Sequence, residues 1–297
     1  MQPNPALKRL GFSNSDRVVI FHTDDIAMCQ ASVAAFAELW DYGIISSGAV
    51  MAVCPWFLEA AAYAAAHPEA DLGVHLTLTS EWKTYRWGPV STRNPRSGML
   101  DEQGYFYSTS EAAQKHGEPG FVRRELQAQV EKVLAAGMQP THIDTHMGSV
   151  AHPKFMQHYT HLSQKTGLPA MNLRLDESAW KAMGLPSLVA QAAARLSARL
   201  EASGVPLLDA CTGMPLDSDE DREQIARHLL GQLPAGITHF LLHPSIDTPE
   251  LRQITPDWRR RVGDYRTFLS PSLKAFIRNA GIQVIGYRAL KNLMPVR

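Results

Sequence analysis

Short apolar runs alternate with helical stretches from about residue 17 to the C-terminus, and this alternation restricts the fold more than any other feature of the chain. Repeated strand–helix units are typical of α/β proteins built on a parallel sheet. Eight candidate strands lie at 18–21, 47–53, 72–78, 142–145, 170–175, 206–209, 238–242 and 283–287. Because the connections are short and mostly helical, the pattern favours a (β/α) barrel, TIM-like and either regular or distorted to seven strands, over a doubly wound open sheet.

Helical spacing fills the regions between the candidate strands. The clearest helices are expected at 31–42, 55–67, 121–136 and 153–165, and Gly43 is placed to cap the first of them. No linker rich in Pro, Gly and Ser divides the chain, so residues 1–297 are expected to form a single domain.

A long insertion follows the third candidate strand. Residues 80 to about 117 hold Gly, Pro, Ser and Asn with no clear period, and such loops are usually functional covers or disordered segments. The insertion also carries six aromatic residues, namely Trp82, Tyr85, Trp87, Tyr105, Phe106 and Tyr107. They could stack on a ligand, with Trp82 and Trp87 as candidate contacts, or they could pin the insertion onto the barrel or bury a dimer contact.

The composition excludes several classes of partner. The chain has 29 Lys and Arg and 29 Asp and Glu, so its formal net charge is zero and neither nucleic acid nor an anionic membrane is expected. No apolar run approaches the roughly 20 residues of a membrane span, and the first residues lack the features of a signal peptide, which predicts a cytoplasmic protein. Cys29, Cys54 and Cys211 have no CxxC spacing, which argues against a disulfide framework or a cysteine zinc cluster.

Acidic residues and histidines follow several of the apolar runs. They are Asp24 and Asp25 after the first run, His75 in the third, Asp144 and His146 after the fourth, and His243 after 238–242. Because the carboxyl ends of parallel strands meet on one face, these groups are expected to converge there. The sequence therefore suggests a metal-dependent hydrolase.

Asp25, His75 and His146 are the candidate metal ligands. A carboxylate and two neutral imidazoles form an ordinary first shell for a catalytic divalent cation that keeps one position open. Asp144, a candidate substrate contact, could orient the imidazole of His146 or join the same site. Each residue has a plainer explanation, since paired aspartates often cap helices and a lone histidine among apolar residues often belongs to the core.

The two adjacent aspartates could divide two tasks. Adjacent residues leaving a strand point in opposite directions, so one carboxylate could hold a cation while the other takes a proton. His243 precedes Pro244, which restricts the backbone, and its ordinary pKa suits a general acid, although a structural role at a tight turn explains it equally well. Arg174, a candidate substrate contact, and Asp209 could pair with each other, with His243, or at the surface.

These segments together resemble the YdjC-like carbohydrate deacetylase family. The motifs that carry the resemblance are Thr23-Asp24-Asp25, the run from Gly73 to Thr79, Asp144-Thr145-His146 and His243-Pro244-Ser245, and they occur in the family's order. The resemblance extends from about residue 17 to 290. Where family members commonly have Gly, Asn and His, this chain has Ala27, Val33 and Gly148.

The resemblance implies a cation site at Asp25, His75 and His146, a general base at Asp24 and an acid at His243. The implied reaction removes an acetyl group from an N-acetylated amino sugar, on which Trp82 and Trp87 could stack. Separately, the chain could form a homodimer. Two nitrogens and one oxygen suit zinc or another transition ion, whereas magnesium prefers oxygen, so either metal stays open.

Two other functions compete with this interpretation. A metal-dependent phosphoesterase would usually need more ligands for two adjacent metals, and the chain has no His-x-His pair. A noncatalytic sugar-binding protein would need neither a base at Asp24 nor an acid at His243.

Overall fold

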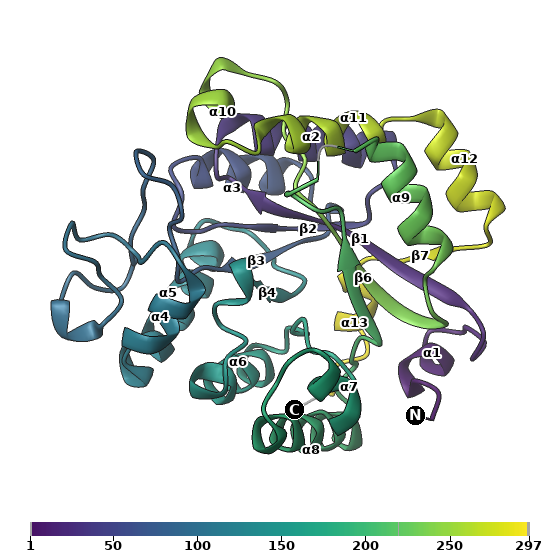
Figure 1. The fold of residues 1–297 in the computed structure, drawn as a ribbon, viewed down its shortest axis with the longest axis horizontal. Helices are drawn as coiled ribbons and strands as arrows, with labels where there is room; N and C mark the ends of the chain where they lie inside the picture. The colour runs from purple at the N-terminus through teal and green to yellow at the C-terminus, as the bar shows by residue number, and fades with distance from the viewer. Residues whose placement is uncertain (1, 219, 296–297) are drawn as a thin grey trace.

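The computed structural model describes residues 2–218 and 220–295 and shows a parallel sheet flanked by helices (Figure 1). The strands are β1 Arg17–Ile26, β2 Ser47–Val50, β3 Leu72–Leu76, β4 Ile143–Thr145, β5 Ala210–Gly213, β6 Gly236–Leu242 and β7 Gln283–Val284. The sheet runs in the order β4-β3-β2-β1-β6-β5, with β7 pairing the start of β1, and all these pairs are parallel. The predicted α/β class is confirmed.

The predicted closed barrel is wrong for the described strands. Their regular ladder ends at β4 on one side and at β5 on the other, so the sheet is a half-barrel. Between those edges lie the isolated bridges Ile143–Ala170 and Leu173–Leu208. The candidate strands at 170–175 and 206–209 are therefore wrong. One cause is local, because Asn172 N–H donates to Ala170 O, so the segment turns after a single bridge. The ladder to β6 resumes only at Ala210.

Thirteen α-helices occur in the described ranges. They are α1 Pro5–Arg9, α2 Gln30–Tyr42, α3 Phe57–Ala66, α4 Ser110–His116, α5 Pro119–Ala135, α6 Pro153–Thr166, α7 Glu177–Ala182, α8 Ser187–Ala202, α9 Arg222–Gly231, α10 Pro249–Ile254, α11 Trp258–Phe268, α12 Pro271–Asn279 and α13 Tyr287–Lys291. Figure 1 shows helices around the strands, with α2, α3, α10 and α11 above them in this view and α6, α7 and α8 below.

The helices predicted from spacing occur within a few residues of their expected ends. Gly43 takes a left-handed conformation, with φ of 71°, and ends α2 as expected for a residue without a Cβ. None of the described helices is both long enough and apolar enough to cross a bilayer.

The insertion is folded and packs into the main core. It contains the 3₁₀ turn η1 (Pro95–Ser97), α4 and a bridge between Leu100 and Phe106. Trp82, Trp87 and Phe106 belong to the largest cluster of buried apolar side chains, together with residues of β1, β2 and β3. The insertion is thus held onto the sheet by hydrophobic contacts.

Candidate active site

Three side chains converge at the carboxyl ends of β1, β3 and β4. Asp25 Oδ1 lies 2.9 Å from His146 Nδ1 and 3.4 Å from His75 Nε2, and the two imidazole nitrogens are 3.3 Å apart. All three residues are buried. The structure therefore brings together the three candidate ligands predicted from the sequence, and their ligand atoms are close enough to hold one metal ion.

The hydrogen-bonding state of Asp25 fits such an ion. Its Oδ1 is buried and has no hydrogen-bond partner, although two imidazole nitrogens lie close to it. An unsatisfied carboxylate oxygen is costly inside a protein. A divalent cation among Asp25, His75 and His146 would satisfy this oxygen, and the donor set suits zinc.

The end of β1 departs from regular strand geometry. Asp25 has a φ of 60°, and the register with β2 shifts between Thr23 and Ile26. Asp24 Oδ2 and Asp25 Oδ1 consequently lie 3.8 and 3.4 Å from the same nitrogen of His75. The expectation that the two aspartates point in opposite directions is wrong, because the left-handed residue breaks the alternation of a strand.

Each candidate imidazole ligand is held by a carboxylate on its other nitrogen. His75 Nδ1 lies 2.8 Å from Asp144 Oδ1, and His146 Nε2 lies 3.2 Å from Glu81 Oε2. Such partners fix the tautomer and orientation of a metal-binding histidine. Asp144 thus orients His75 rather than His146, and it is 1% exposed, so it is placed as a support for a ligand and not as a substrate contact.

Sequence reasoning missed Glu81 and Arg261. Glu81 lies just beyond the motif that ends at Thr79, which was its only signal. Arg261 comes from α11 and donates from Nη1 to Asp25 Oδ2 at 2.7 Å. A helical arginine far along the chain gave no signal of this contact.

The site carries an excess of negative charge around its histidines. Burial opposes protonation of His146, but Glu81 and Asp25 outweigh it and raise the pKa of His146 to about 9. Burial likewise works against the charge of Asp25, yet His146 and Arg261 hold its pKa well below the usual range. The same negative charge that keeps protons on these imidazoles would favour a divalent cation. The cation binds the neutral imidazoles and takes the place of the protons.

Asp24 lies beside this cluster with one oxygen held and the other facing the site. His22 Nδ1 is 2.7 Å from Oδ1, while Oδ2 is 3.9 Å from His243 Nε2. Burial would raise the pKa of Asp24, but the charge of His75 and the hydrogen bond with His22 keep it well below the ordinary value. His243 itself is positioned by its backbone N–H, which donates to Asp264 at 3.2 Å.

The two candidate sugar-stacking residues are buried against the site. Trp87 is 3% exposed and its ring meets His146 edge to face, with 6.4 Å between centroids. Trp82 is 9% exposed and lies under the guanidinium of Arg261. These positions support the interpretation that the aromatics pin the insertion, because little ring surface is left for a ligand.

Arg174 is not brought to the site. Its guanidinium pairs with Glu201, donates to Gln2 O and lies 3.8 Å from Asp209. Asp209 N–H bonds to Ile237 O near the start of β6, so this group lies at the amino end of the sheet, away from Asp25. Of the pairings left open by the sequence, that of Arg174 with Asp209 is formed, and neither residue contacts the candidate ligands.

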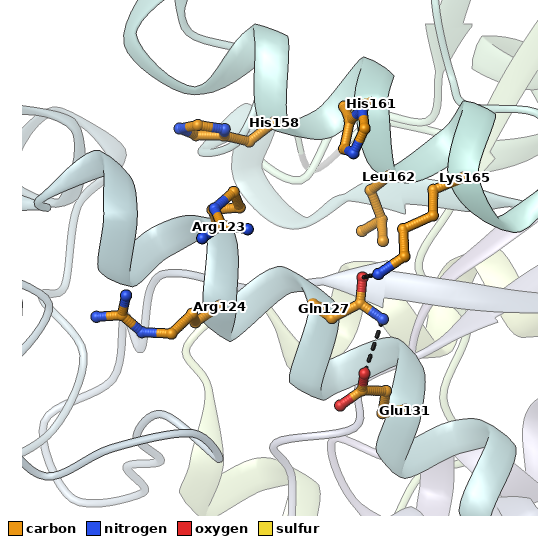
Figure 2. Close-up of a pocket in the computed structure, with 8 residues that line it drawn as sticks. All are labelled: Arg123, Arg124, Gln127, Glu131, His158, His161, Leu162 and Lys165. Atoms are coloured by element: carbon orange, nitrogen blue, oxygen red, sulfur yellow. Dashed lines mark hydrogen bonds between the residues drawn. The ribbon is translucent and has the colours of Figure 1, made fainter.

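A separate surface groove of about 280 Å³ lies between α5 and α6 (Figure 2). Its lining consists of Arg123, Arg124, Gln127, Glu131, His158, His161, Leu162 and Lys165. None of these residues belongs to the cluster of aspartates and histidines at the strand ends. The groove is therefore no part of the candidate active site.

Comparisons with known proteins agree with the motifs. The family model described as "YdjC-like protein" matches residues 18–279. A protein of Thermus thermophilus named "Carbohydrate deacetylase" is 30% identical, over 97% of this chain and 98% of its own length. A protein of the same name from Listeria welshimeri is 27% identical, over 92% of this chain and 99% of its own length.

One solved structure has the same fold. The crystal structure of a candidate cellobiose-phosphate cleavage protein from Enterococcus faecalis superposes with a TM-score of 0.77 at 23% identity, covering 93% of this chain and 99% of that one. The family model spans most of the chain, including β1, β3, β4 and β6 with the motifs at their ends. This protein therefore belongs to the YdjC-like family.

Proposed function

We propose that this protein is a metal-dependent hydrolase that removes the acetyl group from an N-acetylated amino sugar. The observation that carries the proposal is the convergence of Asp25 Oδ1, His75 Nε2 and His146 Nδ1, next to a second carboxylate at Asp24. The names of the relatives support the substrate class. A protein that only bound sugar would need no such arrangement of ligands and base.

Each residue of the cluster has a distinct role in this proposal. A divalent cation held by Asp25, His75 and His146 would supply a Lewis acid for the acetyl carbonyl and the attacking water. Asp24 Oδ2 takes a proton from that water as it adds to the carbonyl carbon. His243 Nε2 gives a proton to the sugar nitrogen as the C–N bond breaks, which leaves acetate and a free amine.

The separation of base and acid suits the two proton transfers. Asp24 Oδ2 and His243 Nε2 are 3.9 Å apart and face one another beside the candidate ligands. His243 Nδ1 is buried without a hydrogen-bond partner, so the described side chains do not fix the tautomer of the ring. A ring that is free to carry its proton on Nε2 can donate at that atom.

The test is acetate release from N-acetylglucosamine and its disaccharide and trisaccharide, measured with zinc-loaded and magnesium-loaded protein. Turnover is expected for at least one of these sugars, and simple acetamides should react poorly because the sugar supplies the binding energy that positions the amide. Asp24→Asn is the matched control, since it keeps the shape of the site and removes the base. No acetate from any of the sugars with either metal would contradict the proposal.

A further inference from the structure

A chain of hydrogen bonds runs through the buried interior of the sheet below the candidate active site. His22 Nε2 lies 2.8 Å from His142 Nε2, and His142 Nδ1 lies 2.9 Å from Thr141 Oγ1. Thr141 Oγ1 in turn bonds to Asp71 Oδ1. His22 and His142 are completely buried, so water cannot replace these contacts. The upper end of the chain is the 2.7 Å contact between His22 Nδ1 and Asp24 Oδ1.

The lower end of the chain is fixed by the backbone. Asp71 Oδ2 accepts from the N–H of Arg288 at 2.7 Å, and Asp71 Oδ1 accepts from Ser47 Oγ at 3.0 Å. Asp71, Thr141 and Ser47 are all buried. Because each member has a fixed neighbour on both sides, the chain can hold its final member, the Asp24 carboxylate, in one orientation.

Burial holds the pKa of His142 well below its usual value. With this ring neutral, two arrangements of protons satisfy the hydrogen-bond chain, and both place a proton on His22 Nδ1. In the first, Thr141 donates to the Asp71 carboxylate, His142 Nδ1–H donates to Thr141, and His22 donates from both of its nitrogens. In the second, a protonated Asp71 donates to Thr141, the threonine hydroxyl donates to His142 Nδ1, and His142 Nε2–H donates to His22. An ionised carboxylate at Asp24 can only accept. In either arrangement His22 Nδ1–H is the donor that it receives.

We propose that His22 is a positioning residue for Asp24, with its Nδ1–H holding Oδ1 so that Oδ2 is turned toward His75 and His243. This inference rests on the proposed role of Asp24 as the base. If Asp24 were free to rotate about its side-chain bonds, either oxygen could face away from the substrate. The carboxylate is held instead by a donor that the rest of the chain supports.

A second metal site at His22, His142 and Asp144 does not account for the contacts of His22 with His142. His22, His142 and Asp144 have ligand atoms close enough to be considered. However, His22 Nε2 and His142 Nε2 are only 2.8 Å apart, and Asp144 Oδ2 lies farther off, 3.7 Å from His22 Nε2. A nitrogen pair this close is a hydrogen bond, and it commits the two nitrogens to each other.

A matched pair of substitutions separates positioning from packing. The amide nitrogen of an asparagine lies near the place of a histidine Nδ1, and that of a glutamine near Nε2. His22→Asn therefore keeps the donor to Asp24 and loses the link to His142, while His22→Gln does the reverse. We expect kcat to fall about 10- to 100-fold in His22→Gln, with KM and cation affinity unchanged, and to fall much less in His22→Asn.

His239 provides the control. It is also completely buried and packs against His22 with the rings tilted and 4.5 Å between their centroids, but its Nδ1 bonds to Tyr287 OH at 2.7 Å. His239→Asn and His239→Gln should disturb the interior to a similar degree without the same difference in kcat. Equal losses of kcat in both His22 variants, or the same asymmetry in the His239 variants, would overturn the proposal.

A measurement on the unaltered protein keeps the test independent of folding and of turnover. Proton–nitrogen correlation spectra of ¹⁵N-histidine-labelled, zinc-loaded protein report which ring nitrogens carry protons. The His22 ring, assigned with a His22 variant, should show a slowly exchanging proton on Nδ1. An Nδ1 without a proton would overturn the positioning role. Absence of acetate release with a protonated Nδ1 would instead count against the proposed function alone.

Discussion

Glu81 Oε2 lies 3.2 Å from Nε2 of His146, on the side of the imidazole opposite Asp25. Glu81 is the first charged residue of the insertion, so this contact joins the insertion directly to a candidate ligand. Trp87, also in the insertion, meets the His146 ring edge to face. The insertion therefore helps to build the site and is more than a cover placed over it.

Removing the Glu81 carboxylate should weaken the cation without abolishing it. Glu81→Gln is expected to lower divalent-cation affinity about 10- to 100-fold, because His146 loses the partner that orients its ring. Titration calorimetry with zinc measures the change. Glu102→Gln, an exposed position on the same insertion, is the control and should leave affinity unchanged. Equal affinities for the two variants would remove Glu81 from the support of the site.

The ligands themselves should be required for occupancy. Purified protein is expected to bind about one divalent ion per chain, as in a mononuclear open site, and His75→Ala and His146→Ala should lose most of it. Elemental analysis after dialysis gives the stoichiometry. His158→Ala, in the separate groove of Figure 2, should keep the ion. Full occupancy in both ligand variants would show that the cation binds elsewhere.

The two aspartates should differ although they are adjacent. Asp24→Asn is expected to retain the cation and to lose about 10²- to 10⁴-fold in acetate release, as when a general base is removed. Asp25→Asn should lose the cation, and asparagine tolerates the left-handed backbone at this position, so folding is preserved. If both variants lost metal equally while folded, Asp24 would be a ligand rather than the base.

The residues at strand ends could be predicted because parallel strands carry their carboxyl ends to one edge. Asp25, His75 and His146 come together for this reason. Glu81 and Arg261 could not be found in this way, since one lies in an aperiodic insertion and the other on the side of a helix. Their contacts depend on tertiary packing that no local pattern records.

The number of strands was overestimated for a related reason. An apolar run predicts burial, but burial alone does not distinguish a strand from an irregular buried segment. At 170–175 the backbone turn at Asn172 limits pairing to single bridges, and this turn has no Gly or Pro signal of its own. The parallel sheet with its helices could be predicted from the alternation, whereas its open edge between β4 and β5 could not.

One departure from the family pattern has a backbone explanation. Ala27, where relatives commonly have Gly, is buried and has a φ of 77°. An alanine in the left-handed region is destabilised by roughly 1–2 kcal/mol. Glycine avoids this strain, but it loses more backbone entropy on folding than alanine does, which offsets part of the gain. Ala27→Gly should therefore leave the free energy of unfolding unchanged or raise it by up to about 1 kcal/mol.

Denaturant unfolding measures this change, with Ala35→Gly as the control. Ala35 is buried in the middle of α2, where glycine should destabilise the protein by about 1 kcal/mol. A similar loss in both variants would show that the conformation of Ala27 carries no strain.

Replacing Trp87 is expected to reduce the stability of the protein rather than its specificity for a sugar. Because the side chain is almost fully buried and donates to Thr79 O at 2.7 Å, Trp87→Ala is expected to cost about 3–5 kcal/mol of stability and to loosen His146. Tyr105→Ala, at a 38% exposed ring, should change stability by less than about 0.5 kcal/mol. A stable Trp87→Ala protein with normal cation affinity and impaired sugar turnover would restore the stacking role.

The pairing of Arg261 with Asp25 has a consequence for how the protein is made. The two residues are 236 positions apart, and a ribosome adds about 5–20 residues per second, so roughly 10–50 s separate their synthesis. During that interval the emerging Asp25 lacks the Arg261 guanidinium that balances its negative charge. The N-terminal strands can pair as they emerge, but the candidate metal centre matures only after translation has passed α11.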